Sequence, residues 1–294
     1  PREAGDRLAS GADTVRMRVA TEMDRMTRSE KRAAHVLLAD YPMIGLENIN
    51  TFAERAKVST ATLQRLVTKL GFDSFSDFRT SLRSELAAVR EGPLTMARWY
   101  AAGDAAPSDL KRSLMTAVEA TLDGIEGSEL DATVRLLVDP RRRIYLAGGA
   151  FTHSIARHLH FHLRKMRPGV VLLEEDMPRR CDSLLDMRRR DVLVAFDIRR
   201  YQPDMRLTAN LANERGGSIV LITDQWMSEI AEIAAHIFRC KVDAATPWDT
   251  IVGLVAVVEQ LAASVDEVLW QDAKPRLEQL DAIRDSTFVP TRDN

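Results

Sequence analysis

The sequence predicts a chain of two parts, an all-α helix-turn-helix domain followed by an α/β domain with a doubly wound parallel sheet. Three observations lead to this prediction. The length of 294 residues is about twice that of an average domain. Apolar residues in the first 90 positions recur every three or four residues, which indicates helices. After residue 108, short apolar runs alternate with helix-length segments, a pattern typical of buried parallel strands.

The composition limits the possible classes of protein. Apolar residues make up 45% of the chain and charged residues 29%, as in ordinary globular proteins. The 41 basic and 43 acidic side chains give a net charge of −2, so any nucleic-acid surface must be local. The longest apolar run, 251–258, is far shorter than the roughly 20 residues that span a bilayer, and no secretory signal is visible. We therefore expect a cytoplasmic protein without membrane contact.

The two cysteines, Cys181 and Cys240, are too few for a disulfide framework or a four-thiolate zinc site. We expect both to be packed thiols.

The first two helices follow from apolar spacing and capping. An apolar face predicts a first helix through Val15, Val19, Met23 and Met26. A second helix is predicted to start at a capping box, in which a hydroxyl and a carboxylate three residues apart satisfy free amides. That box consists of Thr27 and Glu30, and Pro42 and Gly45 are expected to end the helix.

The next two helices have the dimensions of a helix-turn-helix. Asn50 is expected to cap a third helix that ends at Ala56, and a tight turn follows at positions 57 and 58. Ser59 is expected to cap a fourth helix that runs to about Leu70 and is stopped by Gly71.

In a helix-turn-helix the second helix enters the major groove of DNA. No acidic residue occurs between positions 59 and 70, and the segment 55–90 carries seven basic against three acidic side chains. Hydroxyl, amide and guanidinium groups can bond base edges or phosphates. We therefore expect this helix to contact a double-stranded DNA operator through Ser59, Thr60, Thr62, Gln64, Arg65, Thr68 and Lys69.

The helical segments SEKRAAHVLL, FAERAKVSTATLQRLVTKLGF and FSDFRTSL resemble the N-terminal domain of the RpiR/MurR family of bacterial transcription regulators. The later run RRRIYLAGGAFTHSIARHLHFHL resembles the first strand, loop and helix of a SIS (sugar isomerase) domain, which follows the helical domain in that family. The resemblance implies DNA contacts at Ser59, Thr62, Arg65 and Lys69, and a domain that senses phosphorylated sugars.

The expected domains are a DNA-binding domain at 1–90, a connection at 91–108 and a SIS-like α/β domain at 109–285. The connection is rich in proline, glycine and alanine. Apolar runs place the strands at 144–147, 170–173, 192–196, 219–222 and 236–240. One or two long helices are expected from 250 to about 283, with an apolar stripe large enough for part of it to meet a second subunit.

Two loops are candidates for an effector site, because ligands of open α/β sheets bind where the strand order reverses. The first contains Gly148, Gly149 and Thr152, where glycines allow close approach and a helix N-terminus attracts anions. SIS domains usually have a second glycine where this chain has Ala150, and a serine at the position of Thr152.

The second loop departs further from the pattern of the family. It contains Asp197, Arg199 and Arg200 in place of a serine- and threonine-rich phosphate cradle, and Thr223 lies on the same rim. The arginines can bind an anionic effector, such as a sugar phosphate or sugar acid, or can pair with Asp197 in a purely structural loop. Both interpretations stay open.

No cofactor and no metal are expected. His158 and His162 share a helix face, but His160 points elsewhere and no carboxylate is predicted nearby, so packing of the helix is the favoured interpretation. The sequence thus indicates a homodimeric or tetrameric DNA-binding regulator that is not an enzyme. The alternatives are a regulator whose SIS domain only assembles the oligomer, and a SIS-type aldose–ketose isomerase.

Overall fold

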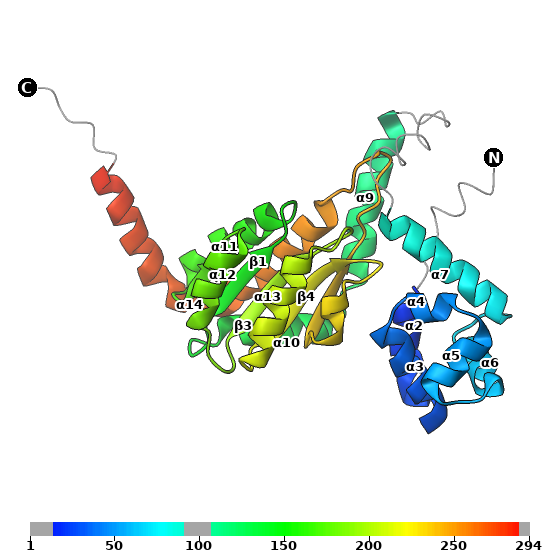
Figure 1. The fold of residues 1–294 in the computed structure, drawn as a ribbon. Coiled ribbons are helices and arrows are strands. Elements are labelled where there is room, and N and C mark those ends of the chain that lie inside the picture. Colours follow the sequence, from blue (N-terminus) through cyan, green and yellow to red (C-terminus); the bar gives the residue numbers. More distant parts are fainter. Residues whose placement is uncertain (1–13, 91–106, 288–294) are drawn as a thin grey trace, which may run out of the picture. The chain divides into compact units, whose positions relative to one another are not determined.

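The computed structural model describes residues 14–90 and 107–287, and the chain divides into two compact units, 1–99 and 100–294. The division falls within the predicted connection 91–108, of which 91–106 lie outside the described residues. Figure 1 labels the elements of both units.

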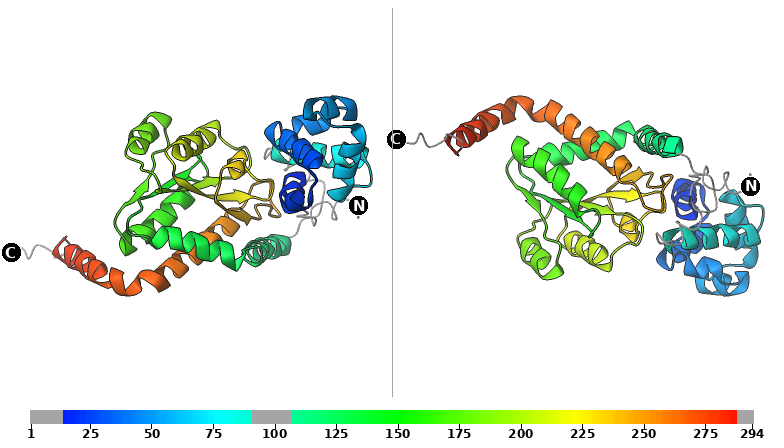
Figure 2. Two further views of the ribbon diagram at one scale, coloured as in Figure 1. Left: turned by 90° about the horizontal axis from the view of Figure 1, so that it is seen from below. Right: turned by 90° about the horizontal axis from the view of Figure 1, so that it is seen from above.

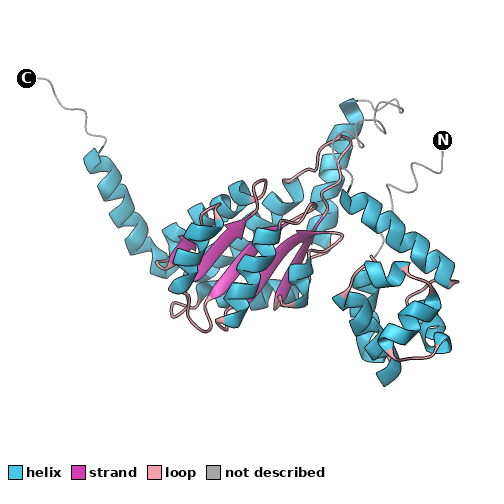
Figure 3. Cartoon of the chain, in the orientation of Figure 1, coloured by secondary structure: helices cyan, strands magenta, loops and turns pink. Residues whose placement is uncertain are grey.

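Only helices and turns occur in residues 14–90, as Figure 3 shows. The apolar spacing has the predicted effect, because Val15, Val19 and Leu37 are fully buried in one core with Leu63 and Leu66. The elements are α2 (Val15–Glu22), the 3-10 turn η1 (Met23–Arg25), α3 (Arg28–Ala39), α4 (Met43–Leu46), α5 (Ile49–Ala56), α6 (Thr60–Lys69) and α7 (Phe75–Arg90).

The capping box that starts α3 is confirmed: the Thr27 hydroxyl accepts from the amide of Glu30, and the Glu30 carboxylate accepts from the amide of Thr27. Two other predicted boundaries are wrong. The helix ends at Ala39, and Pro42 instead precedes the short α4. The third helix begins earlier than predicted, because Asn48 and not Asn50 accepts from the amide of Thr51.

The helix-turn-helix itself is confirmed. Lys57 adopts the left-handed conformation with φ of 51° at the end of α5, and Ser59 caps α6 by accepting from the amide of Thr62. Gly71 has φ of 85°, a value that glycine adopts readily, and it follows the end of α6.

The second unit contains a five-stranded parallel sheet in the order β2-β1-β3-β4-β5. All five predicted strands are present: β1 (Ile144–Gly148), β2 (Val170–Leu172), β3 (Val192–Asp197), β4 (Ser218–Asp224) and β5 (His236–Cys240). Helices separate them along the chain: α9 (Pro107–Asp123), α10 (Gly127–Val138), α11 (His153–Met166), α12 (Met177–Leu185), α13 (Pro203–Glu214), the 3-10 turn η2 (Glu229–Glu232) and α14 (Val252–Thr287).

Both faces of the sheet are covered, as Figure 2 shows. Alternate residues of β3 belong to different cores, as the period of two in a strand requires. Val194 and Phe196 pack in one core with residues of α10, α11 and α14, whereas Leu193 and Ala195 pack in the other with residues of α12 and α13. The doubly wound α/β fold is therefore confirmed.

The last helix, α14, is continuous through Pro275. Its apolar stripe packs within the unit, because Leu254, Val258, Leu261 and Val265 are fully buried in the core. Ile251 and Val255 of the same stripe are only partly buried, and the expectation that part of the stripe meets a second subunit stays a prediction. No helix in the two described ranges is both long and apolar enough to cross a membrane.

Candidate DNA-binding surface and effector site

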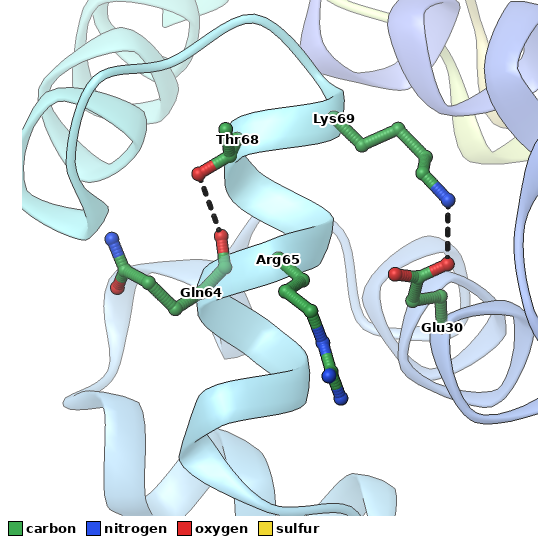
Figure 4. A pocket seen from close by; sticks show the side chains of 5 residues that line it. All are labelled: Glu30, Gln64, Arg65, Thr68 and Lys69. Carbon is green, nitrogen blue, oxygen red and sulfur yellow. Dashed lines mark hydrogen bonds and ion pairs between the residues drawn. The ribbon is translucent and has the colours of Figure 1, made fainter.

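The exposed face of α6 carries five of the seven predicted DNA contacts. Ser59, Thr60, Gln64, Arg65 and Thr68 are exposed, and the opposite face of the helix is buried in the helical core. In the close-up of Figure 4, the side chains of Gln64 and Arg65 extend away from the axis of α6. The helix therefore presents amide, guanidinium and hydroxyl groups to solvent on a rigid support.

Thr62 does not belong to this exposed face. Its side chain is buried, with 6% exposure, because it lies on the inner side of the first turn. Its hydroxyl lies 3.0 Å from the Ser59 hydroxyl and accepts from Nη2 of Arg65 at 3.3 Å. Thr62 is thus hydrogen-bonded to Ser59 and Arg65, and its role as a direct DNA contact stays a prediction.

Lys69 is paired with a carboxylate. Its ammonium donates to Oε2 of Glu30 at 2.7 Å (Figure 4). It also donates to the carbonyl of Arg25 at 3.0 Å. Burial alone would raise the pKa of Glu30, but bonds from Lys69 and Thr27 hold that pKa below its ordinary value. No acidic residue occurs within α6 itself, but the fold places Glu30 of the distant α3 beside Lys69.

The two predicted effector loops meet at the switch point of the sheet. The chain passes from β1 to β2 on one side and then to β3 on the other, so the carboxyl ends of β1 and β3 adjoin where the order reverses. The Thr152 hydroxyl donates to the carbonyl of Phe196 at 2.7 Å and accepts from the amide of Gly149. It does not cap α11.

Gln202 occupies the space above the glycine loop. Its Oε1 accepts from the amide of Ala150 at 2.8 Å, and a Cβ built on Gly149 would lie 2.3 Å from the same oxygen. A side chain at position 149 would therefore displace the Gln202 carboxamide from this place. Sequence reasoning missed Gln202, although its place before Pro203 at the start of α13 directs it to this edge of the sheet.

Arg199 is held by acidic partners. Its Nη2 lies 2.7 Å from Asp243, its Nε lies 3.2 Å from Asp249, and its guanidinium stacks 4.0 Å from the ring centre of Trp226. Only 2% of the side chain is exposed. Of the two interpretations of this loop, the structural ion pair holds for Arg199, but the partners are Asp243 and Asp249 rather than Asp197.

Asp197 and Thr223 are also internal. Asp197 accepts from the hydroxyl of Ser228, and the Thr223 hydroxyl donates to the carbonyl of Asp197 at 2.6 Å. Burial and the neighbouring Asp224 raise the pKa of Asp197 to about 7, and burial raises the pKa of Asp224 to about 6. These buried residues therefore support the loops after β3 and β4 through hydrogen bonds.

Arg200 is the exposed cation of this loop. It has φ of 70°, unusual for a residue other than glycine, and its side chain is exposed. Burial raises the pKa of Asp249, and the charges of Arg199 and then Arg200 act in the opposite direction. Of the two predicted arginines, Arg200 alone faces solvent.

Two expectations about the chemistry of side chains are corrected. Cys240 is buried, but Cys181 is exposed on α12 and is not a packed thiol. A carboxylate does lie near the histidines of α11: Glu259 of α14 is 2.7 Å from Nε2 of His158. Residues His158, His162 and Glu259 have ligand atoms within 4.8 Å of one another.

Family models match both units. Residues 14–89 match the helix-turn-helix domain of the rpiR family, and residues 136–264 match the SIS domain. Together with the exposed face of α6, this order of domains defines a DNA-binding transcriptional regulator with a SIS domain.

Two related proteins are named as regulators of the same class. The chain is 22% identical to an uncharacterized HTH-type transcriptional regulator of Providencia stuartii, over 76% of this chain and 79% of that one. An HTH-type transcriptional regulator of Haemophilus influenzae is 24% identical over 72% and 74%. The chain belongs to the RpiR family of regulators.

Two solved structures share the fold. The sugar isomerase domain of an RpiR transcription factor from Sphaerobacter thermophilus has a TM-score of 0.56 at 23% identity, covering 60% of this chain and 98% of that one. The NanR protein of Vibrio vulnificus, complexed with ManNAc-6P, has a TM-score of 0.53 at 18% identity, covering 94% and 100%.

Proposed function

We propose that α6 reads the operator through Arg65 and Gln64, with Ser59, Thr60 and Thr68 as further contacts. The observation that carries this proposal is the exposed, acid-free row of polar side chains over a fully buried apolar face. A guanidinium can bond guanine with two hydrogen bonds, and a carboxamide can bond adenine in the same way. Thr62 supports Arg65 from within the helix.

The SIS domain senses a small anionic metabolite at the switch point. The loop from Gly148 to Thr152 leads into the N-terminus of α11, which Thr152 leaves uncapped, and a helix N-terminus favours an anion. Arg200 supplies an exposed positive charge on the facing loop. A structure with this fold, that of NanR, was solved with a sugar phosphate, ManNAc-6P, which supports this class of ligand.

Binding of an anion at the glycine loop requires Gln202 to move. An anion that takes the amide of Ala150 must displace the Gln202 carboxamide, which now accepts from that amide. Because Gln202 is the residue before α13, its movement links ligand binding to the start of that helix. In a homodimer or tetramer, such a change alters the mobility or spacing of the paired helix-turn-helix domains.

Thermal unfolding of the full chain with sugar phosphates and sugar acids tests the sensor. The expected result is a rise in the melting temperature with one compound class, lost in Arg200→Ala. Arg199→Ala is unsuitable, because it leaves the carboxylates of Asp243 and Asp249 without their cation. A compound that stabilises parent and Arg200→Ala equally argues against a role for this arginine.

A SIS domain that binds no ligand and only assembles the oligomer is the second candidate. Two observations favour it: Gln202 fills the loop, and Arg199 is already neutralised. It predicts no stabilisation by any compound of the panel, together with loss of operator binding when assembly is disrupted. Incubation with the same sugar phosphates also tests isomerase activity, for which we expect no turnover.

A further inference from the structure

A cluster of imidazoles and carboxylates lies where α11 and α14 pack against each other. His158 and His162 are one turn apart on α11, with ring centres 4.9 Å apart and the rings edge to face. Nε2 of His158 lies 2.7 Å from Oε1 of Glu259 on α14. One ligand atom from each of the three residues lies within 4.8 Å of the other two.

The two helices that carry this cluster are firmly held. Leu159 and Leu163 of α11 are fully buried in one core with Val258 and Leu261 of α14. Further along, Nη2 of Arg276 donates to the carbonyl of Arg164 at 3.0 Å. The backbone spacing between the helices is thus fixed by the core.

The side chains of the cluster retain freedom on this fixed backbone. The side chain of His158 is 39% exposed and that of Glu259 is 55% exposed, so an ion can reach them from solvent. A hydrogen-bonded pair of His158 and Glu259 needs no second imidazole. The position of His162 beside this pair is therefore the feature that points to a metal.

We propose that His158, His162 and Glu259 bind a divalent transition metal ion of the zinc class. Imidazole nitrogen and carboxylate oxygen are ligands of Zn²⁺ at roughly 2.0–2.2 Å, which places tetrahedral ligand atoms about 3.3 Å apart. The present separations, from 2.7 Å to at most 4.8 Å, reach that value with small side-chain rotations. Hard cations such as Mg²⁺ prefer oxygen ligands.

Another carboxylate of α14 interacts with this cluster. Asp266 of α14 is half-buried and interacts electrostatically with His162. Three protein ligands leave a coordination position for water.

The bound ion ties α11 to α14. Because α11 begins at the glycine loop, the ion stiffens the helix whose N-terminus faces the switch point. The site does not depend on DNA or on an anionic effector, and its test is separate from theirs.

Calorimetric titration of the tag-free, metal-free full chain with Zn²⁺ tests the site. The expected result is one ion per chain, bound in the presence of excess Mg²⁺. At a free Zn²⁺ concentration 100 times the dissociation constant, the melting temperature rises by roughly 5–10 °C. Co²⁺ in place of Zn²⁺ gives the visible absorption of a nitrogen- and oxygen-bound ion.

Three single variants locate the ion: His158→Gln, His162→Gln and Glu259→Gln. Each is expected to weaken Zn²⁺ binding at least tenfold, since even loss of an outer-sphere group costs that much. His160→Gln is the matched control, because His160 lies on the same helix but interacts with the backbone of Val170. Glu259→Gln changes only a half-exposed carboxylate, so it tests the site without unfolding the chain.

The absence of Zn²⁺ binding by the parent chain overturns the proposal. So does binding that all three variants retain, which would place the ion elsewhere, for example at the exposed Cys181. Weakening by His160→Gln as strong as by the other variants also contradicts it.

Discussion

Asp197→Asn provides a prediction whose size follows from the structure. Asp197 has 3% exposure, and burial and the charge of Asp224 raise its pKa to about 7, against bonds from Ser228 and Gln202 that lower it. The ordinary value is 3.8, so the difference corresponds to about 4 kcal/mol, at about 1.4 kcal/mol per pKa unit. This free energy is the penalty of holding the ionised carboxylate inside the fold.

The sign of the pH dependence follows from the raised pKa. Between pH about 4 and pH about 7 the unfolded chain has lost the proton of Asp197 while the folded chain keeps it, so stability falls as pH rises through this window. Asparagine carries no charge at any pH. Its amide can donate to Ser228 while its oxygen accepts from the backbone of Gln202.

Denaturant unfolding followed by tryptophan emission measures this effect. Three of the four tryptophans, Trp226, Trp248 and Trp270, lie in the α/β unit, so most of the emission reports on it. We expect Asp197→Asn to match the parent near pH 4 and to exceed its stability at pH 8 by up to about 4 kcal/mol. Parallel curves of stability against pH for the two proteins would refute the reasoning.

Three further predictions concern an ion pair, a helix cap and the effector loop. Glu30→Gln keeps the capping oxygen but removes the charge that pairs with Lys69, which frees Lys69 to contact a DNA phosphate. The slope of log affinity for DNA against log salt concentration should then steepen by about 0.9 in anisotropy titrations, and an unchanged slope argues against this. Asn48→Ala should destabilise the helical unit by about 1 kcal/mol in unfolding followed by circular dichroism, whereas Asn50→Ala should have little effect. A larger loss of stability in Asn50→Ala than in Asn48→Ala would show that Asn50 caps the helix, as the sequence predicts. Gln202→Ala should tighten binding of the stabilising sugar phosphate or sugar acid severalfold in calorimetry, because the carboxamide no longer competes for the amide of Ala150. Weaker binding would instead mean that Gln202 contacts the bound compound.

Elements with strong local signals were predictable from the sequence. The capping box of Thr27 and Glu30, the cap of Ser59 and the apolar strands all appear where periodicity and capping rules place them. The start of α5 was misplaced, because Asn48 and Asn50 are equally good caps and only the fold selects between them.

The contacts between distant segments were not predictable. Lys69 meets Glu30, and His158 meets Glu259, from helices that are far apart in the sequence. Likewise, Arg199 finds its partners Asp243 and Asp249 only once β3 and the segment after β5 lie together. A single sequence shows the charges but not the pairs, so it does not decide between the two interpretations of the effector loop.

The role of α6 is tested most directly by binding-site selection with the parent chain and Arg65→Ala. Arg83→Ala serves as the charge-matched control, since Arg83 is exposed on α7. If α6 reads the operator, Arg65→Ala loses about 1–3 kcal/mol of specific affinity and accepts any base at one position of each half-site, while Arg83→Ala keeps the parent's base preference. An unchanged operator preference for Arg65→Ala would contradict this role.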